Sequence, residues 1–159
     1  MTKALFPGSF DPIHNGHLEV IERASRLFDV VVVAVLRNPH KDEPLFSAAE
    51  REQMVAECVS RFDNVEIVSM STLVVEVVRQ VGADVIVKGL RAVTDFENEL
   101  QMAQMNQQLS GVETLMLPTG STFSFISSRL VREVARFGGD VSAFVPDPVA
   151  MRMKERFGG

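Results

Sequence analysis

The residues Gly8-Ser9-Phe10-Asp11-Pro12-Ile13-His14-Asn15-Gly16-His17 follow a short apolar run, Ala4–Phe6, and precede an amphipathic segment that starts at Leu18. This order is typical of a strand, a glycine-containing turn and a helix. A helix start carries unpaired backbone N–H groups and the positive end of the helix dipole, and it therefore favours anions such as phosphates. His14 and His17 stand at that start, where an imidazole can donate a hydrogen bond to a phosphate oxygen. The stretch therefore predicts a nucleotide phosphate site.

Five short apolar runs alternate with helical patterns along the chain. They predict strands at residues 4–6, 30–36, 65–68, 85–87 and 113–117. The run at 30–36 is apolar throughout, which is typical of a strand buried on both faces of a parallel sheet. Apolar residues at helical spacing predict helices between the strands, over about 18–27, 48–62, 73–81 and 95–110.

Several helix ends have a recognisable sequence signal. Ser47 with Glu50 and Thr94 with Glu97 have the spacing of capping boxes, and a glycine follows each of the helices predicted at 73–81 and 95–110. The pair Ser127-Ser128 stands where a further helix begins.

The last helical pattern follows Asp147 as the expected N-cap and Pro148 as the expected first residue. The complete pattern predicts one α/β domain over residues 1–159. It has a doubly wound, Rossmann-like sheet of five parallel strands with right-handed crossovers, and a C-terminal helix.

Polar residues follow three of the predicted strands, as Gly8-Ser9, residues 38–41 and Lys88–Arg91. In a doubly wound sheet, ligands bind beyond the carboxyl ends of the strands, where the strand order reverses. We therefore expect the three groups to meet at one sheet edge, beside the helix start at Ser127. Three cations would converge there, although the whole chain is acidic.

The composition limits the classes of function. The net charge of −5 disfavours general binding to nucleic acid, because the backbone phosphates would be repelled. The one cysteine, Cys58, excludes an internal disulfide and a cysteine metal cluster, and its helical pattern predicts buried packing. The run at 30–36 is far shorter than the roughly 20 residues that span a bilayer, and the N-terminus lacks the layout of a signal peptide. We expect a cytoplasmic protein that binds neither nucleic acid nor membranes.

His14 and His17 can also be read as a metal-binding pair. Their spacing alone does not supply enough ligands, and no cysteine or carboxylate cluster stands nearby in the sequence, so no metal-binding residue is predicted. The stretch is not a Walker loop, since no Gly-Lys-Ser/Thr follows, and it lacks the Gly-x-Gly-x-x-Gly dinucleotide fingerprint. His17 is the candidate for phosphate binding, whereas the role of His14 stays open between phosphate contact and a cap or surface residue.

Other residues have an ordinary structural reading beside the functional one. Lys41 and Lys88 could be solvated charges, but their positions after strands favour phosphate contacts. Ser127-Ser128 could be only a cap, but a double serine followed by two arginines in the first turns also suits a polyphosphate. Met102 and Met105 are expected to pack, either within the domain or at a subunit contact.

Several motifs together resemble a known family. The stretch Gly8–His17 and Ile126-Ser127-Ser128, with Arg132 at the arginine of the second motif, resemble the HxGH and ISSxxxR signatures of the nucleotidyltransferase superfamily. Residues 87–106, including Lys88-Gly89-Leu90-Arg91, and Ser124–Ser128 are similar to the bacterial phosphopantetheine adenylyltransferases. The similarity runs from residue 4 to about 150.

The resemblance implies reversible transfer of adenylyl from ATP to 4′-phosphopantetheine, giving dephospho-coenzyme A and pyrophosphate in coenzyme A biosynthesis. It implies phosphopantetheine contacts at Ser9, Lys41, Val74 and Lys88. It implies an ATP site lined by Ser9, Phe10, His17, Gly89, Leu90, Arg91, Glu99, Phe123, Ser124, Phe125, Ile126, Ser127, Ser128 and Arg129. Family members are typically homohexamers that use Mg²⁺ and are inhibited by coenzyme A.

The mechanism expected from these residues needs no covalent intermediate, because the acceptor phosphate is already an anion that can attack the α-phosphate of ATP directly. Catalysis is then positioning and stabilisation of charge. We assign His17 to the transition-state phosphate, Lys41 and Lys88 to the acceptor and α-phosphate, and Arg91 to the β- and γ-phosphates, with the helix start at Ser127. We expect any Mg²⁺ to be held mainly by the phosphates.

Three positions depart from the family pattern. Position 14 is usually threonine or serine, whereas His14 is what a nicotinate-mononucleotide adenylyltransferase would carry. Lys88 replaces a frequent arginine and loses its bidentate fork. Arg129 stands where serine is common, so only a backbone contact carries over. Two alternatives therefore stay open: a nicotinate-mononucleotide adenylyltransferase, and a non-catalytic nucleotide-binding module.

Overall fold

The computed structural model describes residues 1–37 and 43–158. Its sheet contains the strands β1 (Lys3–Gly8), β2 (Val30–Leu36), β3 (Val65–Met70), β4 (Val85–Leu90) and β5 (Glu113–Pro118). The strands lie in the order β3-β2-β1-β4-β5 and pair in parallel throughout. The chain runs outward from β1 to β3 and then returns to the other side of β1, so the strand order reverses between β1 and β4. This confirms the predicted doubly wound sheet.

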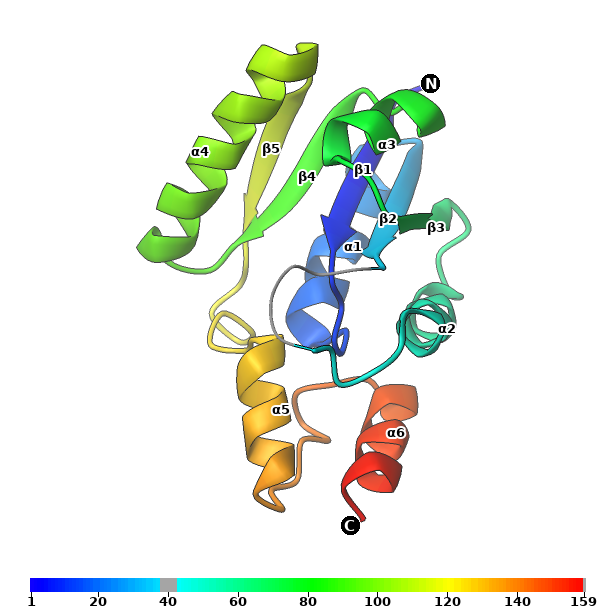
Figure 1. The fold of residues 1–159 in the computed structure, drawn as a ribbon, viewed down its shortest axis with the longest axis vertical. Coiled ribbons are helices and arrows are strands. Elements are labelled where there is room, and N and C mark those ends of the chain that lie inside the picture. The colour runs from blue at the N-terminus through cyan, green and yellow to red at the C-terminus, as the bar shows by residue number, and fades with distance from the viewer. Residues whose placement is uncertain (38–42, 159) are drawn as a thin grey trace.

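The helices of the described residues are α1 (Asn15–Leu27), α2 (Ala48–Val59), α3 (Val74–Val81), α4 (Val93–Ser110), α5 (Ser128–Arg136) and α6 (Asp147–Phe157). Figure 1 shows α5 and α6 below the sheet, beyond the ends to which the strand arrows point. Helices therefore surround the carboxyl ends of β1 and β4, where a ligand is expected.

Alternate residues of β2 face two separate apolar cores. Val31, Val33 and Val35 belong to the larger core, which includes side chains of α1, α2, α5 and α6. Val32 and Ala34 belong to the second core, together with valines of α3. Because both faces of β2 are covered, every side chain in this stretch is apolar, and the strand is the one predicted at 30–36. Cys58 lies buried in the larger core, as expected.

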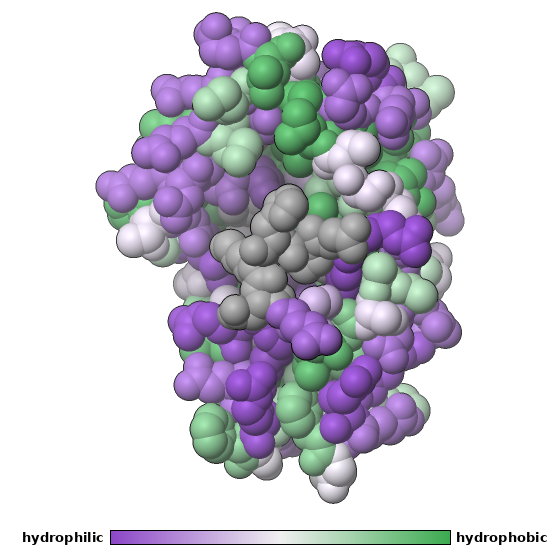
Figure 2. All heavy atoms as spheres, viewed as in Figure 1, coloured by the Kyte–Doolittle hydropathy of each residue, from purple (hydrophilic) through white to green (hydrophobic). Residues whose placement is uncertain are grey.

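The helix α4 exposes several large apolar side chains. Val93, Phe96, Met102, Met105 and Leu109 are all exposed to solvent. Hydrophobic residues are visible near the upper end of this helix in Figure 2. Within one chain, α4 therefore leaves apolar surface uncovered.

The structure corrects several predicted helix ends. Thr94 and Glu97 do not form a capping box, because α4 begins at Val93 and its N-cap is Ala92, which makes no side-chain cap hydrogen bond. Thr94 therefore lies inside the first turn, where its hydroxyl cannot cap. In α6, the N-cap is Pro146, one residue before the predicted Asp147.

Other ends differ in length. The helix α1 begins at Asn15 instead of Leu18, because the side chain of His14 caps it. The helix α2 ends at Val59, so Phe62 lies beyond it. The strand β4 continues to Leu90, which places Lys88 inside the strand. The capping box of Ser47 with Glu50 and the αL glycines at 82 and 111 are confirmed.

Candidate functional site

The start of α1 is capped by two histidines that bond to each other's backbone. Nδ1 of His14 accepts hydrogen bonds from the backbone N–H groups of Gly16, at 3.0 Å, and His17, at 3.3 Å. Nδ1 of His17 accepts from the backbone N–H of His14, at 3.1 Å. A neutral imidazole has one donor and one acceptor nitrogen, so both rings carry their proton on Nε2. His17 therefore presents an N–H donor on the side away from the helix backbone.

Both histidines are neutral near pH 7. Burial, with a further effect of the Arg91 cation, lowers the pKa of His14 to about 3. The pKa of His17 lies well below 6.5, because of burial first and then of the neighbouring His14, Arg91 and Lys88. Both histidines therefore meet an incoming phosphate in the neutral form. His17 offers a neutral N–H donor, while the positive charge of the cavity comes from Lys88, Arg91 and Arg132.

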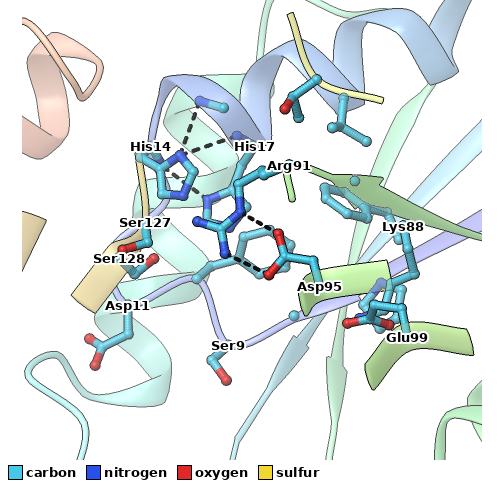
Figure 3. Close-up of a pocket in the computed structure, with 18 of the residues that line it drawn as sticks. Ser9, Asp11, His14, His17, Lys88, Arg91, Asp95, Glu99, Ser127 and Ser128 are labelled. Atoms are coloured by element: carbon cyan, nitrogen blue, oxygen red, sulfur yellow. Dashed lines mark hydrogen bonds and ion pairs between the residues drawn. The ribbon is translucent and has the colours of Figure 1, made fainter. Parts of the chain in front are cut away.

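A cavity of about 400 Å³ lies at the switch point of the sheet. Its walls come from the end of β1, the start of α1, β4, the first turns of α4, the loop after β5 and the start of α5. Figure 3 shows side chains from these separate segments gathered around one space. The predicted residues that line it are Ser9, Phe10, His17, Lys88, Gly89, Arg91, Glu99, Ser127 and Ser128.

Two of the three cations that line this cavity, Lys88 and Arg91, are paired with carboxylates of α4, and the third is Arg132. Nε of Arg91 lies 3.0 Å from Oδ2 of Asp95, and Nη1 of Arg91 donates to the carbonyl of Ile126 at 2.7 Å. Nζ of Lys88 lies 3.5 Å from Oε2 of Glu99. The pairs keep both cations oriented toward the cavity (Figure 3).

Two further cavities adjoin the first. One, of about 500 Å³, includes Val74 among mainly apolar walls and shares Ser9, Lys88 and Glu99 with the first cavity. The other, of about 860 Å³, includes Ser124, Phe125 and Arg129, and shares Ser9, Arg91 and Ser127 with the first. Ser9 lines all three, so it marks the place where they meet.

Three predicted ATP-site residues line none of these three cavities, and one predicted residue lies outside the described residues. Leu90 and Ile126 contribute through their backbone: their carbonyls accept from Thr119 N–H and Arg91, respectively. Phe123 packs against the larger core. Lys41 falls in the range 38–42, which the structure does not describe.

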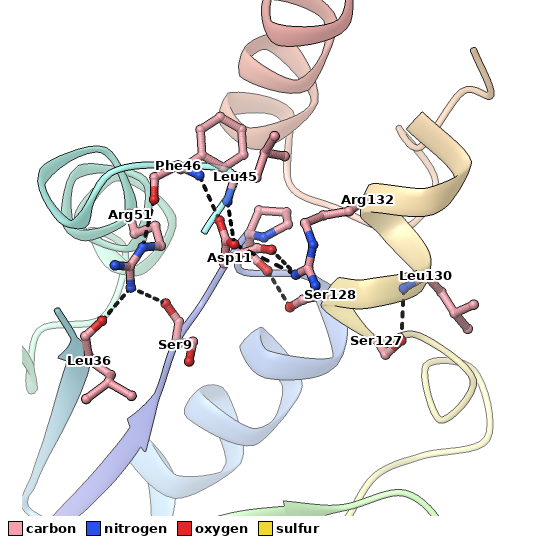
Figure 4. A network of polar contacts seen from close by, with 11 residues as sticks. Ser9, Asp11, Leu36, Leu45, Phe46, Arg51, Ser127, Ser128, Leu130 and Arg132 are labelled. Atoms are coloured by element: carbon pink, nitrogen blue, oxygen red, sulfur yellow. Dashed lines mark hydrogen bonds and ion pairs between the residues drawn. The ribbon is translucent and has the colours of Figure 1, made fainter. Parts of the chain in front are cut away.

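A network around Asp11 joins the turn after β1 to the start of α5 (Figure 4). The buried Asp11 carboxylate accepts from the backbone N–H groups of Leu45, at 2.8 Å, and Phe46, at 2.9 Å. Arg132 donates to the Asp11 carbonyl at 2.6 Å, and the Ser128 hydroxyl donates to the Pro12 carbonyl at 2.8 Å. These bonds place the N-terminus of α5 beside that of α1. As predicted, Ser127 is the N-cap of α5, and it accepts from the N–H of Leu130.

The loop after β5 is fixed by α1. The N–H of Gly120 donates to Oε1 of Glu19 at 2.7 Å, and Arg23 donates to the carbonyl of Pro118. The N–H of Thr119 donates to the carbonyl of Leu90 at 2.8 Å. Thr119 is thereby held on the wall of the first cavity.

Sequence reasoning missed several residues of the site. Asp95 stands four residues after Arg91, a spacing that favours a helical ion pair and could have indicated it. Asp11 was given no role of its own in the predicted site, yet its carboxylate accepts from two backbone amides. Thr119 gave no signal in the sequence.

Neither a metal cluster nor a membrane-spanning helix is found in the part of the chain that the structure describes. No group of three or more His, Cys, Asp or Glu side chains is arranged to hold a metal ion within residues 1–37 and 43–158. Over the same residues, no helix has both the length and the apolar character needed to cross a membrane.

The sequence is similar to characterised families over nearly its whole length. The cytidylyltransferase-like family matches residues 5–134. A phosphopantetheine adenylyltransferase of Heliobacterium modesticaldum is 50% identical over 159 residues, which covers 99% of this chain and 94% of the relative. One of a Synechococcus species is 54% identical over 155 residues, with 97% of each chain covered.

A solved structure from Vibrio parahaemolyticus, named provisionally as a nicotinate-nucleotide adenylyltransferase, has a TM-score of 0.70 and 20% sequence identity. The match covers 98% of this chain and 93% of that chain. At this identity the likeness shows a shared fold and does not extend to the acceptor substrate.

Proposed function

Because this chain belongs to the phosphopantetheine adenylyltransferase family, within the cytidylyltransferase-like proteins, we propose that it transfers adenylyl from ATP to 4′-phosphopantetheine. The products are dephospho-coenzyme A and pyrophosphate, and the reaction is reversible. The observation that carries the proposal is the position of His17, whose free Nε2–H faces a cavity that also contains Lys88 and Arg91.

We assign the acceptor to the cavity of about 500 Å³. Val74, Leu36 and Met102 give it apolar walls that suit the pantetheine arm. Ser9 and Lys88 stand at the boundary with the first cavity and suit the terminal phosphate. The donor phosphate and the acceptor phosphate then meet beside these two residues.

ATP occupies the first cavity, with its triphosphate directed toward the start of α5. Gly89 lines this cavity beside Val20, and a Cβ at position 89 would lie 2.9 Å from Cγ2 of Val20, so glycine lets β4 pack closely on α1 at the cavity wall. Arg91 and the N-terminus of α5, from Ser127 to Arg129, bind the β- and γ-phosphates. The 860 Å³ cavity, which Arg129 lines, accommodates this end of the nucleotide.

The reaction is one in-line displacement. An oxygen of the acceptor phosphate forms a bond to the α-phosphorus, and the bond from that phosphorus to the oxygen bridging to the β-phosphate breaks. Pyrophosphate leaves with the electron pair. His17 donates a hydrogen bond to a non-bridging oxygen as charge develops, and Lys88 balances that charge. Lys41, outside the described residues, is assigned to the same phosphates through the family motif.

Mg²⁺ is the proposed cofactor. Asp95 and Glu99, the carboxylates nearest the two cations, pair with Arg91 and Lys88 and do not offer a free ligand set. We therefore propose that Mg²⁺ enters with ATP, is held mainly by its oxygens, and neutralises phosphate charge there.

We further propose a cytoplasmic homo-oligomer, a hexamer in keeping with the family, with coenzyme A as an inhibitor that competes for the same cavities. The apolar face of α4, including Met105 and Leu109, supports subunit contact through this helix. Sedimentation equilibrium should give about six times the chain mass of 17.6 kDa. Leu109→Glu should lower that mass, and Phe137→Glu, at an exposed position near the end of α5, should not.

An isotope experiment tests the reaction type. With ATP labelled at the α-phosphate, the label should appear in the coenzyme A precursor and pyrophosphate should stay unlabelled. With ATP labelled at the γ-phosphate, the label should appear in pyrophosphate alone. Labelled inorganic phosphate or labelled ADP would show hydrolysis or kinase activity and would reject adenylyl transfer.

A further inference from the structure

Arg51 of α2 is a fully buried cation that donates to four backbone carbonyls. Figure 4 shows its bonds to Ser9, Leu36 and Phe46. Nη1 donates to the carbonyl of Ser9 at 2.8 Å and to that of Leu36 at 2.6 Å. Nε donates to the carbonyl of Phe46 at 3.1 Å, and Nη2 to that of Arg37 at 3.1 Å. A buried charge is costly unless hydrogen bonds compensate it, and here carbonyl oxygens provide them.

These carbonyls belong to separate segments at one edge of the sheet. Ser9 follows β1, Leu36 ends β2, and Phe46 precedes α2. The planar guanidinium has five donors in a fixed geometry, so one side chain holds all three segments in a defined arrangement. A lysine ammonium donates from a single atom and cannot reproduce it.

The Ser9 carbonyl that accepts from Arg51 belongs to the peptide bond between Ser9 and Phe10, and Phe10 has a strained backbone conformation. Phe10 has a φ of 51°, a left-handed conformation that a bulky side chain adopts only when its surroundings impose it. Its ring contacts the ring of His17 edge-on, with 4.9 Å between centroids, and that of Phe6, with 5.5 Å. Arg51 is thus linked to His17 through the Ser9 carbonyl and the Phe10 ring.

We propose that Arg51 is a positioning residue for adenylyl transfer, which fixes the Ser9–Phe10 backbone and thereby the His17 ring and the junction of the two substrate cavities. This inference rests on the proposed function for its effect on turnover. Arg51 lines none of the three cavities described above and touches neither substrate in this arrangement. Its effect should therefore fall on kcat more than on the KM for ATP.

The test compares Arg51→Lys with Met54→Ala, a cavity-forming change at a fully buried residue of the same helix. Pyrophosphate release is measured per folded protein, and thermal unfolding measures the stability of both variants. Arg51→Lys should lower kcat about 10- to 100-fold with a KM for ATP within about threefold of wild type. Met54→Ala should lose stability but keep kcat within about twofold. Equal kcat in the two variants would overturn the proposal.

A second variant and an NMR measurement keep the test decisive if Arg51→Lys does not fold or if no turnover is measured. Arg51→Gln, which keeps two donors, replaces Arg51→Lys if the latter does not fold. If neither folds, Arg51 serves the fold alone and the proposal is rejected. NMR of the His17 imidazole should show a shifted Nε2–H resonance in the folded Arg51 variant and an unchanged one in Met54→Ala, and no difference between the two would also reject it. Wild-type protein without turnover would reject the proposed function, and the NMR comparison would still decide on Arg51.

Discussion

The imidazole rings of His14 and His17 lie stacked, with 3.7 Å between their centroids and 25° between their planes. Each ring also uses Nδ1 to accept from the backbone at the start of α1. The two histidines of one motif therefore have different roles. His14 caps the helix and stacks on the ring of His17, and the Nε2–H of His17 faces the cavity.

Replacing His17 should abolish most turnover. His17→Ala removes the neutral donor to the transition-state phosphate, and the loss of one such donor costs about 3–4 kcal/mol, or about 10²–10³ in kcat. The measurement is kcat for pyrophosphate release, with circular dichroism as the control for folding. A folded variant with nearly wild-type kcat would remove His17 from the mechanism.

Replacing His14 should have a much smaller effect. A threonine hydroxyl can accept from the same helix N–H groups as an N-cap, so His14→Thr should keep kcat within about tenfold of wild type. Steady-state kinetics on this variant beside His17→Ala gives the comparison. A loss as large as that of His17→Ala would mean that His14 itself contacts the reacting phosphate.

The free energy of unfolding should decrease as the pH is lowered through the ordinary histidine range. The pKa of His14 is about 3 in the folded protein and 6.5 when unperturbed, so between these values the unfolded chain binds a proton that the folded chain excludes. Stability therefore rises with pH across this window. Between pH 7.5 and 5, His14 alone should account for a loss of about 2 kcal/mol. His17 adds in the same direction.

Urea unfolding at pH 7.5 and 5, at one fixed protein concentration, measures this loss in wild type and in His14→Thr. The variant lacks the titrating group and should lose about 2 kcal/mol less than wild type. Equal losses in the two proteins would show that His14 is not held neutral.

We expect ATP binding to depend on the forked geometry of the Arg91 guanidinium group, and not only on its charge. Arg91→Lys keeps the charge but cannot bond Asp95 and the Ile126 carbonyl at once, so we expect the KM for ATP to rise about tenfold. Arg79→Lys, in an exposed pair with Glu76 on α3, is the matched control and should change neither KM nor stability measurably. Similar kinetics in both variants would argue against a phosphate contact for Arg91.

The strands were largely predictable from the sequence, because a strand that is buried on both faces is an unbroken run of apolar residues. The apolar run at 30–36 matches β2, and the convergence of strand ends at one edge follows from parallel pairing. The helix ends of α4 and α6 were predicted wrongly, because a capping sequence does not show whether the helix has already begun.

The supporting contacts of the site could not be predicted. Arg51 looks like any charged residue of an amphipathic helix, and only the folded chain brings the carbonyls of Ser9 and Leu36 to it. Asp11 is similar, since its partners Leu45 and Phe46 lie more than thirty residues away. The residues that carry the proposed chemistry stand in short sequence motifs and can be recognised there. The residues that hold them in place are identified only by tertiary contacts.

The central claim is adenylyl transfer to phosphopantetheine at this site, and the choice of acceptor tests it most directly. Pyrophosphate release from ATP is measured with wild-type protein, once with 4′-phosphopantetheine and once with nicotinate mononucleotide. We predict turnover with the first acceptor and none above background with the second. Turnover only with nicotinate mononucleotide, or ATP binding without turnover on either acceptor, would contradict the claim.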